Sequence, residues 1–303
     1  MNKGRGFQRG WWLVLITIGV MYTASVPFIF INPSEDSFLY MLCCEAVLAI
    51  PLIVGVFMLF WENDPGGIAA GMGLRGFSGR LLPFILLLPV TAQSFSGFLL
   101  MPIQALLTLL FGAQDYGDIL ETGGIIGFLQ NFVVLCVLAP VFEEAICRGV
   151  LMQLFKRYGA VVMLVFSSLG FALLHQSAQS LLPVFFLGMV LGLIRITTGS
   201  LLAAMAAHSA SNLYAFILLT AGEMFGMEWL LMAAGVAGFP VLMWYYMKKC
   251  DLYYNWRGDL VKEYKPTGFS IGLVVVVVLF GLFNLWILLQ RLFDGVFFYE
   301  MLY

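Results

Sequence analysis

The stretch LAPVFEEAICRGVLMQLF, Leu138 to Phe155, places two adjacent glutamates and an arginine in a run that is otherwise apolar enough for a lipid bilayer. An ionised side chain at the centre of a bilayer is costly unless it is paired or lines a polar cavity. Glu143, Glu144 and Arg148 are therefore candidates for a functional site inside a membrane helix.

The composition of the whole chain agrees with a membrane setting. Of its 303 residues, 62% are hydrophobic and 11% are charged, and the mean hydropathy is +0.97. A soluble domain carries about 25% charged residues, so this chain has too few to cover a surface in water. Long apolar blocks, unlike the short alternating segments of a β-barrel, predict an all-α polytopic transmembrane helical bundle in the lipid bilayer. No basic stripe indicates a nucleic-acid partner.

Nine apolar blocks are long enough to span a bilayer. They fall near residues 11–31, 38–61, 81–111, 125–155, 160–178, 181–196, 201–221, 229–247 and 271–289. The third and fourth blocks are overlong and contain Pro102 and Pro140, where a helix can kink. We therefore expect about eight or nine spans in three regions. These are N-terminal transmembrane helices over 1–119, a catalytic core over 120–225, and C-terminal transmembrane helices over 226–303.

The basic residues predict how the spans are oriented. Thirteen of the fifteen lysines and arginines fall in every second loop, and Arg148 and Arg291 are the exceptions. Because the positive-inside rule assigns the basic loops to the cytosol, we expect a cytosolic N-terminus, a cytosolic Lys248–Lys265 loop and an outer C-terminus. The first apolar run has no signal-peptide cleavage site, so we expect an uncleaved span. The alternate loops carry the acidic residues Glu35, Asp36, Asp115, Asp118, Glu121 and Glu223.

Both histidines of the chain, His175 and His208, lie inside predicted spans. Three spans each carry two motif residues spaced four apart, which share one helix face. Glu143 and His208 lie 13 residues from the neighbouring cytosolic basic residue, roughly 20 Å along a helix. His175 lies 18 residues from its own, about 27 Å, and helix tilt absorbs the difference. The spaced pairs are Glu144 with Arg148, Phe171 with His175 (FALLH), and His208 with Asn212 (HSASN).

Two adjacent carboxylates cannot both ionise cheaply in a low dielectric. Arg148 is placed to keep Glu144 charged, which leaves Glu143 available for proton transfer. His175 then orients or shares the proton of Glu143. These roles are those of a general base and its partner.

His208 and Asn212 share a helix face and carry hydrogen-bond donors that suit an oxyanion. The sequence shows no Ser–His or Cys–His signature, which makes water the expected nucleophile. The combination predicts hydrolysis of an amide in or near the membrane. A purely structural alternative is that these polar groups form hydrogen bonds between packed helices and have no other role. We interpret Glu45 in this way. An ion or proton carrier is a further alternative.

The motifs EExxxR, FxxxH and HxxxN, in this order on separate spans, resemble the CPBP family of type II CAAX prenyl proteases and bacteriocin-processing and self-immunity proteins. The resemblance covers roughly residues 120–225. The tripeptide GLR at Gly73–Arg75 is a weaker similarity upstream of that region. It implies an intramembrane endopeptidase that acts on a membrane-associated peptide or protein. The site residues that it implies are Glu143, Glu144, Arg148, His175, His208 and Asn212.

Two mechanisms remain open. Glu143, His175 and His208 match the ligands of a zinc site with an open water position, with Glu144 as base. A metal-free scheme is slightly favoured, because the charge of Arg148 opposes a nearby dication. The alternative function is a non-proteolytic membrane scaffold or a bacteriocin self-immunity protein of the same family. The alternating charges suit a bacterial cytoplasmic membrane.

Overall fold

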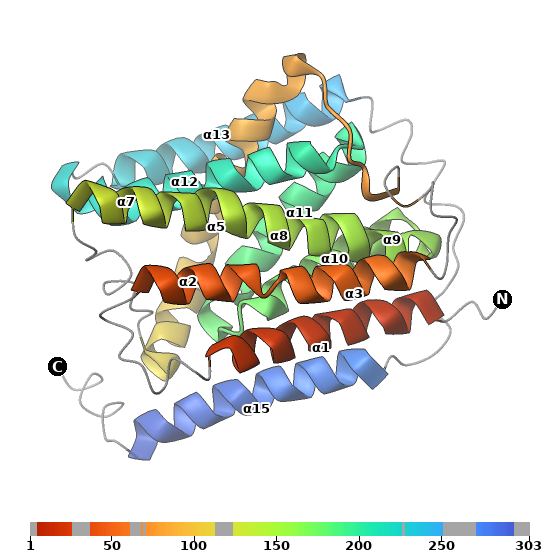
Figure 1. Cartoon of the computed structure of the whole chain (residues 1–303). Coiled ribbons are helices and arrows are strands. Elements are labelled where there is room, and N and C mark those ends of the chain that lie inside the picture. The colour runs from red at the N-terminus through yellow and green to blue at the C-terminus, as the bar shows by residue number, and fades with distance from the viewer. Residues whose placement is uncertain are drawn as a thin grey trace.

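The computed structural model describes residues 5–25, 37–60, 68, 71–112, 124–225, 228–250 and 271–293. These residues are nearly all helical and contain no strand, which confirms the predicted all-α class (Figure 1). In chain order the α-helices are α1 (Arg5–Ser25), α2 (Ser37–Ala46), α3 (Ala49–Phe60), α5 (Leu82–Phe111), α7 (Gly124–Val133), α8 (Ala139–Glu144), α9 (Met152–Phe155), α10 (Ala160–Leu174), α11 (Ala178–Thr198), α12 (Leu201–Phe225), α13 (Glu228–Lys249) and α15 (Ile271–Phe293).

Seven helical stretches among the described residues are long and apolar enough to cross a membrane. They coincide with all the predicted blocks except the first and the fifth. Those two blocks form α1, with 21 residues, and α10, with 15 residues. The chain is therefore a multi-pass membrane protein. The seven stretches are Met41–Phe60, Gly79–Phe111, Gly124–Phe155, Ala178–Thr198, Leu201–Leu219, Trp229–Lys249 and Ile271–Leu292.

The fourth block is one continuous helical rod, Gly124–Phe155, through which α7, α8 and α9 follow one another (Figure 1). The rod is not uniformly α-helical, because Val134–Leu138 and Ala145–Leu151 are π-helical. These two segments flank the short α8, which carries both glutamates of the EExxxR motif. Single π turns inside α-helices are frequent at functional sites. The predicted disturbance near Pro140 thus takes the form of a change in helix type.

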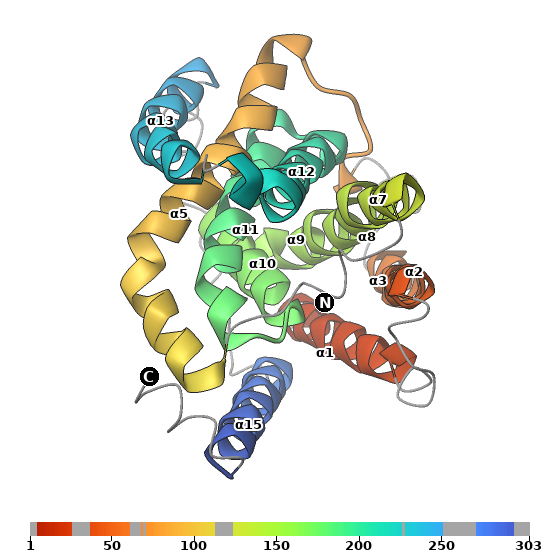
Figure 2. The same cartoon turned by 90° about the vertical axis from the view of Figure 1, so that its left-hand side faces the viewer.

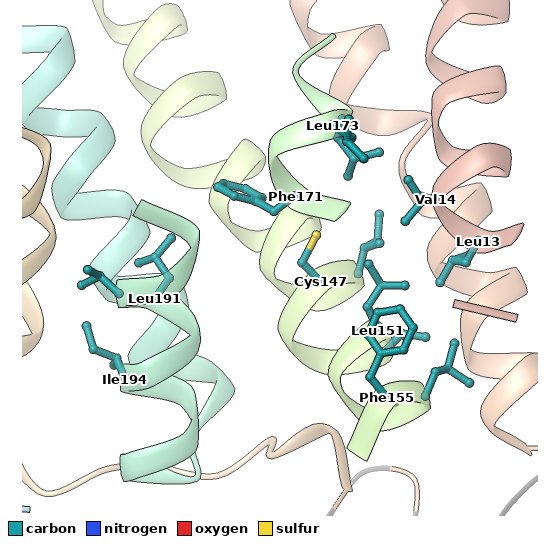
Figure 3. Packing of buried hydrophobic residues seen from close by; sticks show 14 of the residues in the cluster. Leu13, Val14, Cys147, Leu151, Phe155, Phe171, Leu173, Leu191 and Ile194 are labelled. Carbon is teal, nitrogen blue, oxygen red and sulfur yellow. The ribbon is translucent and has the colours of Figure 1, made fainter. Parts of the chain in front are cut away.

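The centre of the bundle is an apolar core (Figure 3). The rod packs there against α1, α3, α10 and α12. Phe155 and Leu151 are fully buried, as is Cys147 within the EExxxR motif. Cys147 thus has the buried position expected of a small apolar residue. The core fixes the rod on several sides, so the polar side chains on it are held in defined positions.

Two of the basic loops meet at one end of the bundle. The Gly71 carbonyl accepts a hydrogen bond from Arg195 Nη2 at 2.9 Å, and the Gly73 carbonyl accepts one from Leu201 N at 2.7 Å. Arg75 Nε donates to the Gly199 carbonyl at 2.9 Å. The GLR segment therefore seals the turn between α11 and α12. Its close approach to that turn requires the positive φ of Gly73, 72°.

Several residues used for the topology prediction lie outside the described ones. They are Lys3, Glu35, Asp36, Asp115, Asp118, Glu121, Arg257, Lys262 and Lys265, together with the side chains of Arg5, Arg157 and Glu223.

α15 lies at the edge of the bundle and packs mainly against α1 (Figure 2). Its one buried polar residue, Asn284, accepts a hydrogen bond from the Ala178 backbone N–H at 3.0 Å. This bond fastens α15 to the first residue of α11. The C-terminal helix therefore reaches the short connection that carries His175.

Candidate active site

Glu144 lies at the centre of a buried polar cluster. Its Oε1 accepts hydrogen bonds from Arg148 Nη1 at 2.8 Å and from His208 Nδ1 at 3.0 Å. The side chains of Glu144 and Arg148 are fully buried, and that of His208 is 3% exposed. Charges buried to this extent require partners. Glu144 is the partner of Arg148 and of His208, and both of them donate to it.

Arg148 has two further contacts, one with a backbone carbonyl and one with an aromatic ring. Its Nη2 donates to the Gly188 carbonyl at 2.9 Å, and its guanidinium carbon lies 4.3 Å from the centre of the Phe171 ring. The ring face attracts the cation. α11 packs closely on α10 at Gly188, where an added Cβ would lie 3.1 Å from Ser168 Cβ. Phe171 of the FxxxH motif thus contacts the EExxxR motif directly.

Glu143 has different surroundings from its neighbour. Its Oε2 lies 3.7 Å from His208 Nε2, and 19% of its side chain is exposed. It lines a pocket of about 450 Å³ together with His175. His208 therefore stands between the two glutamates, with one ring nitrogen toward each, and Glu143 is the carboxylate that reaches open space.

His175 ends α10 and is exposed within the same pocket. Its Nδ1 is 3.0 Å from the Phe171 carbonyl oxygen. A carbonyl only accepts, so this contact assigns the proton to Nδ1 and leaves Nε2 as an acceptor. The ring also meets Phe171 edge-on, with centroids 5.0 Å apart. His175 is thus oriented toward the site of Glu143 by its own helix.

Asn212 completes a hydrogen bond that Pro140 cannot make. In the π-helical register, Ala139 N donates to Val134 O five residues back, so residue 140 is the expected donor to Leu135 O. Pro140 has no N–H. Asn212 Nδ2 donates to Leu135 O instead, at 2.8 Å. The structure therefore ties the HxxxN motif to the backbone just before the glutamates, and one N–H of Asn212 is already engaged.

Sequence reasoning assigned no role to Gln176, which follows His175 and lines the same pocket. Gln176 has a φ of 55°, and it is the one non-glycine residue with positive φ in the described part of the chain. Such a conformation costs an L-residue about 1–3 kcal/mol and marks functional sites. Nothing in the sequence pattern signals it, because glutamine is no usual left-handed residue.

Glu45, interpreted as a packing group, also belongs to these surroundings. Its Oε2 is buried and has no hydrogen-bond partner among the described residues. It lies near enough to Glu143 for the two carboxylates to interact electrostatically. Glu45 is therefore unsuitable as a distant control for substitutions of Glu143.

The three residues of the alternative zinc site, Glu143, His175 and His208, do not form a metal-holding group as the structure places them. Within the described ranges, no group of three His, Cys, Asp or Glu side chains is placed to hold a metal ion. His208 directs both ring nitrogens at carboxylates, and His175 Nδ1 faces a backbone carbonyl. The side chains as placed do not form the His₂Glu set that a zinc-activated water requires.

The fold and this cluster define a helical membrane protein with a polar site inside its bundle. Residues 125–214, which hold all three motifs, match the family model described as type II CAAX prenyl endopeptidase Rce1-like. The resemblance predicted from the motifs is thus confirmed for residues 125–214, and this region of the membrane protein is similar to type II CAAX prenyl endopeptidases.

A curated protein is similar to this chain over part of its length. Over 134 residues, 28% are identical to a protein of Escherichia coli called "Uncharacterized 24.3 kDa protein". The match covers 42% of this chain and 54% of the relative, so the chain spans about half of that protein's length. No solved structure matches.

Proposed function

We propose that this protein is an intramembrane endopeptidase in which Glu143 activates a water molecule. The observation that carries the proposal is the contrast between the two glutamates. Glu144 is fully buried and bonded to Arg148 and His208, whereas Glu143 opens with His175 onto a pocket. A carboxylate with access to water and a neighbouring imidazole suits a general base.

In the proposed reaction, the Glu143 carboxylate takes one proton from the water. The water oxygen forms a bond to the carbonyl carbon of the scissile amide, and the carbonyl oxygen becomes an oxyanion. Collapse of this intermediate breaks the C–N bond while the Glu143 proton passes to the leaving nitrogen. The products are a carboxyl group and an amine. His175 Nε2, as an acceptor, orients the attacking water.

His208 is proposed as the hydrogen-bond donor to the oxyanion. Its contact with Glu144 determines which protonation state of the ring can fill that role. Nδ1 is engaged with Glu144, so Nε2 donates to an oxyanion only when the ring carries both protons. Glu144 supplies the counter-charge for that imidazolium. Asn212 has one N–H left after its bond to Leu135 O, which it contributes to the same oxyanion.

The proposed substrate is a membrane-associated peptide or protein. Polar side chains in the pocket, among them Gln176, Gln179 and Asn284, give water a favourable place at this depth. Hydrolysis needs such water, and the apolar exterior of the bundle does not provide it. The pocket therefore accounts for how an intramembrane site obtains its second reactant.

The test compares membrane peptides from cells that carry the wild type with those from cells that carry Glu143→Gln. We expect peptides that accumulate in the variant and are cleaved by purified wild type in liposomes. The variant must insert and accumulate normally, which membrane fractionation shows. Cleavage by Glu143→Gln at the wild-type rate would reject the assigned base. A cellular phenotype that needs the protein but survives the substitution would favour the scaffold or self-immunity function.

A further inference from the structure

Gln176 stands at the junction of two cavities. It lines the pocket of Glu143 and His175, and it also lines an apolar groove of about 460 Å³. Among the described residues, Phe283 of α15 also lines both. The groove therefore adjoins the proposed catalytic pocket.

The groove is bounded by α1 on one side and α15 on the other. Leu15 and Ile18 come from α1, and Phe280 and Trp286 come from α15. Its described lining is almost entirely hydrocarbon and aromatic, and Gln176 is the only side-chain amide among those described residues. Both helices lie outside residues 125–214, so the groove is a feature that the family match does not describe.

The other pocket-lining amides are already hydrogen-bonded. Gln179 Nε2 donates to the Gly112 carbonyl at 2.7 Å, and its Oε1 accepts from Ser177 Oγ at 2.9 Å. Asn284 bonds the Ala178 N–H and the Phe280 carbonyl. The Gln176 side chain makes no hydrogen bond to any described residue, although its backbone is held in an unfavourable conformation. A strained residue with an unused donor and acceptor at a cavity junction indicates a ligand-binding role.

We propose that Gln176 hydrogen-bonds the main chain of a peptide substrate at the point where its apolar residues leave the α1–α15 groove and the scissile bond enters the catalytic pocket. This inference rests on the proposed endopeptidase function. A carboxamide matches one main-chain N–H and one C=O at the same time. The apolar lining selects apolar side chains next to the scissile bond, because a polar side chain placed there would lose its hydrogen bonds without gaining new ones.

The test uses the full chain in phosphatidylcholine liposomes and two internally quenched peptide libraries. The libraries differ in a single block, Leu-Leu-Phe-Leu in one and Ser-Ser-Thr-Ser in the other. We expect the wild type to cleave the apolar library more than about tenfold faster, because burying the hydroxyl groups of the polar block without partners is costly. Gln176→Met keeps the shape without the amide and is expected to raise KM about tenfold, the effect of one lost hydrogen bond, with kcat little changed.

Two glycines offer a matched pair for the groove. Gly19 lines it, and an added Cβ there meets nothing within 4 Å, so Gly19→Leu fills the groove without a clash at Cβ. Gly281 on α15 is equally open but does not line the groove. We expect Gly19→Leu to abolish the preference for the apolar library and Gly281→Leu to keep it.

The variant Gln176→Gly distinguishes a structural role of Gln176 from the proposed binding role, because glycine removes the strain of the positive φ. We expect this variant to melt at a higher temperature than the wild type and yet to show the raised KM. An unchanged KM in both Gln176 variants would overturn the assignment of Gln176. Equal cleavage of the libraries, or equal behaviour of the two leucine variants, would overturn the groove.

A second readout does not depend on cleavage. The apolar peptide, carrying a photoreactive leucine in its block, is cross-linked to wild type and to Glu143→Gln. Cross-links to α1 and α15 that disappear in Gly19→Leu support the groove even if no peptide is cleaved, which would then reject the endopeptidase function alone. Cross-links elsewhere, or unchanged in Gly19→Leu, reject the groove whether or not cleavage occurs.

Discussion

Glu143 and Glu144 are adjacent in the chain and face opposite nitrogens of the same His208 ring. Glu143 Oε2 lies 3.7 Å from Nε2, and Glu144 Oε1 lies 3.0 Å from Nδ1. Their exposures differ as well, 19% for Glu143 and none for Glu144. The same substitution at the two positions should therefore have different consequences.

Glu144→Gln is expected to destabilise the protein, whereas Glu143→Gln is not. Removing Glu144 leaves the Arg148 charge buried without its counter-ion, which typically costs about 3–5 kcal/mol. Thermal unfolding in detergent measures the difference. Glu144→Gln combined with Arg148→Met should recover much of the lost stability without restoring cleavage. Equal melting temperatures for the two single variants would contradict the buried ion pair.

His175→Ala and His208→Ala are each expected to lower the rate of peptide cleavage by at least two orders of magnitude, about 3 kcal/mol. His175 orients the water, and His208 donates to the oxyanion in the proposed mechanism. Cleavage rates in liposomes test this, with membrane accumulation of each variant as the control. Wild-type function in both variants and in Glu143→Gln would favour the scaffold.

Asn212→Leu is expected to cost about 1–3 kcal/mol of stability, because it leaves the Leu135 carbonyl without a donor. Pro140→Ala restores a backbone N–H at the residue that the π-helical register places opposite that carbonyl. The penalty of Asn212→Leu should therefore shrink in the Pro140→Ala background. A double-mutant cycle of unfolding free energies measures this coupling. Strictly additive effects would show that Asn212 does not substitute for the missing N–H.

The sequence predicted the parts of this structure that depend on local spacing. Glu144 and Arg148 are four residues apart and pair, and Phe171 and His175 share a face for the same reason. The helical class follows from composition, since apolar blocks of this length have few other solutions in a bilayer.

The rest depends on contacts between distant segments. The π-helical turns around α8 leave the hydrophobic pattern unchanged, so hydropathy cannot reveal them. The acceptor of Asn212 is the carbonyl of Leu135, 77 residues away. The groove beside Gln176 needs the packing of α1 against α15, from the two ends of the described chain.

The topology prediction places the basic loops in the cytosol. The bonds that join Gly71 and Gly73 to the turn at Gly199 bring two of those loops to one end of the bundle, as a common side requires. Reporter fusions within Asp115–Glu121 should report the outside, and fusions within Lys248–Lys265 the cytosol. A cytosolic signal from the first set would contradict the orientation given by the positive-inside rule.

The metal-free mechanism predicts that protein stripped of metal keeps its cleavage activity in the presence of a strong chelator. The charge of Arg148 already balances Glu144, and the cationic guanidinium disfavours a dication beside it. His208 Nδ1 is hydrogen-bonded to Glu144, so this nitrogen cannot turn to an ion without breaking that bond. The measurement is the peptide-cleavage rate before and after chelation, with metal content determined on the same samples. Activity that disappears with the chelator, returns with stoichiometric zinc, and is accompanied by loss of zinc binding in His175→Ala would show a metal-activated water. His175 would then be a ligand and not the residue that orients the water for Glu143.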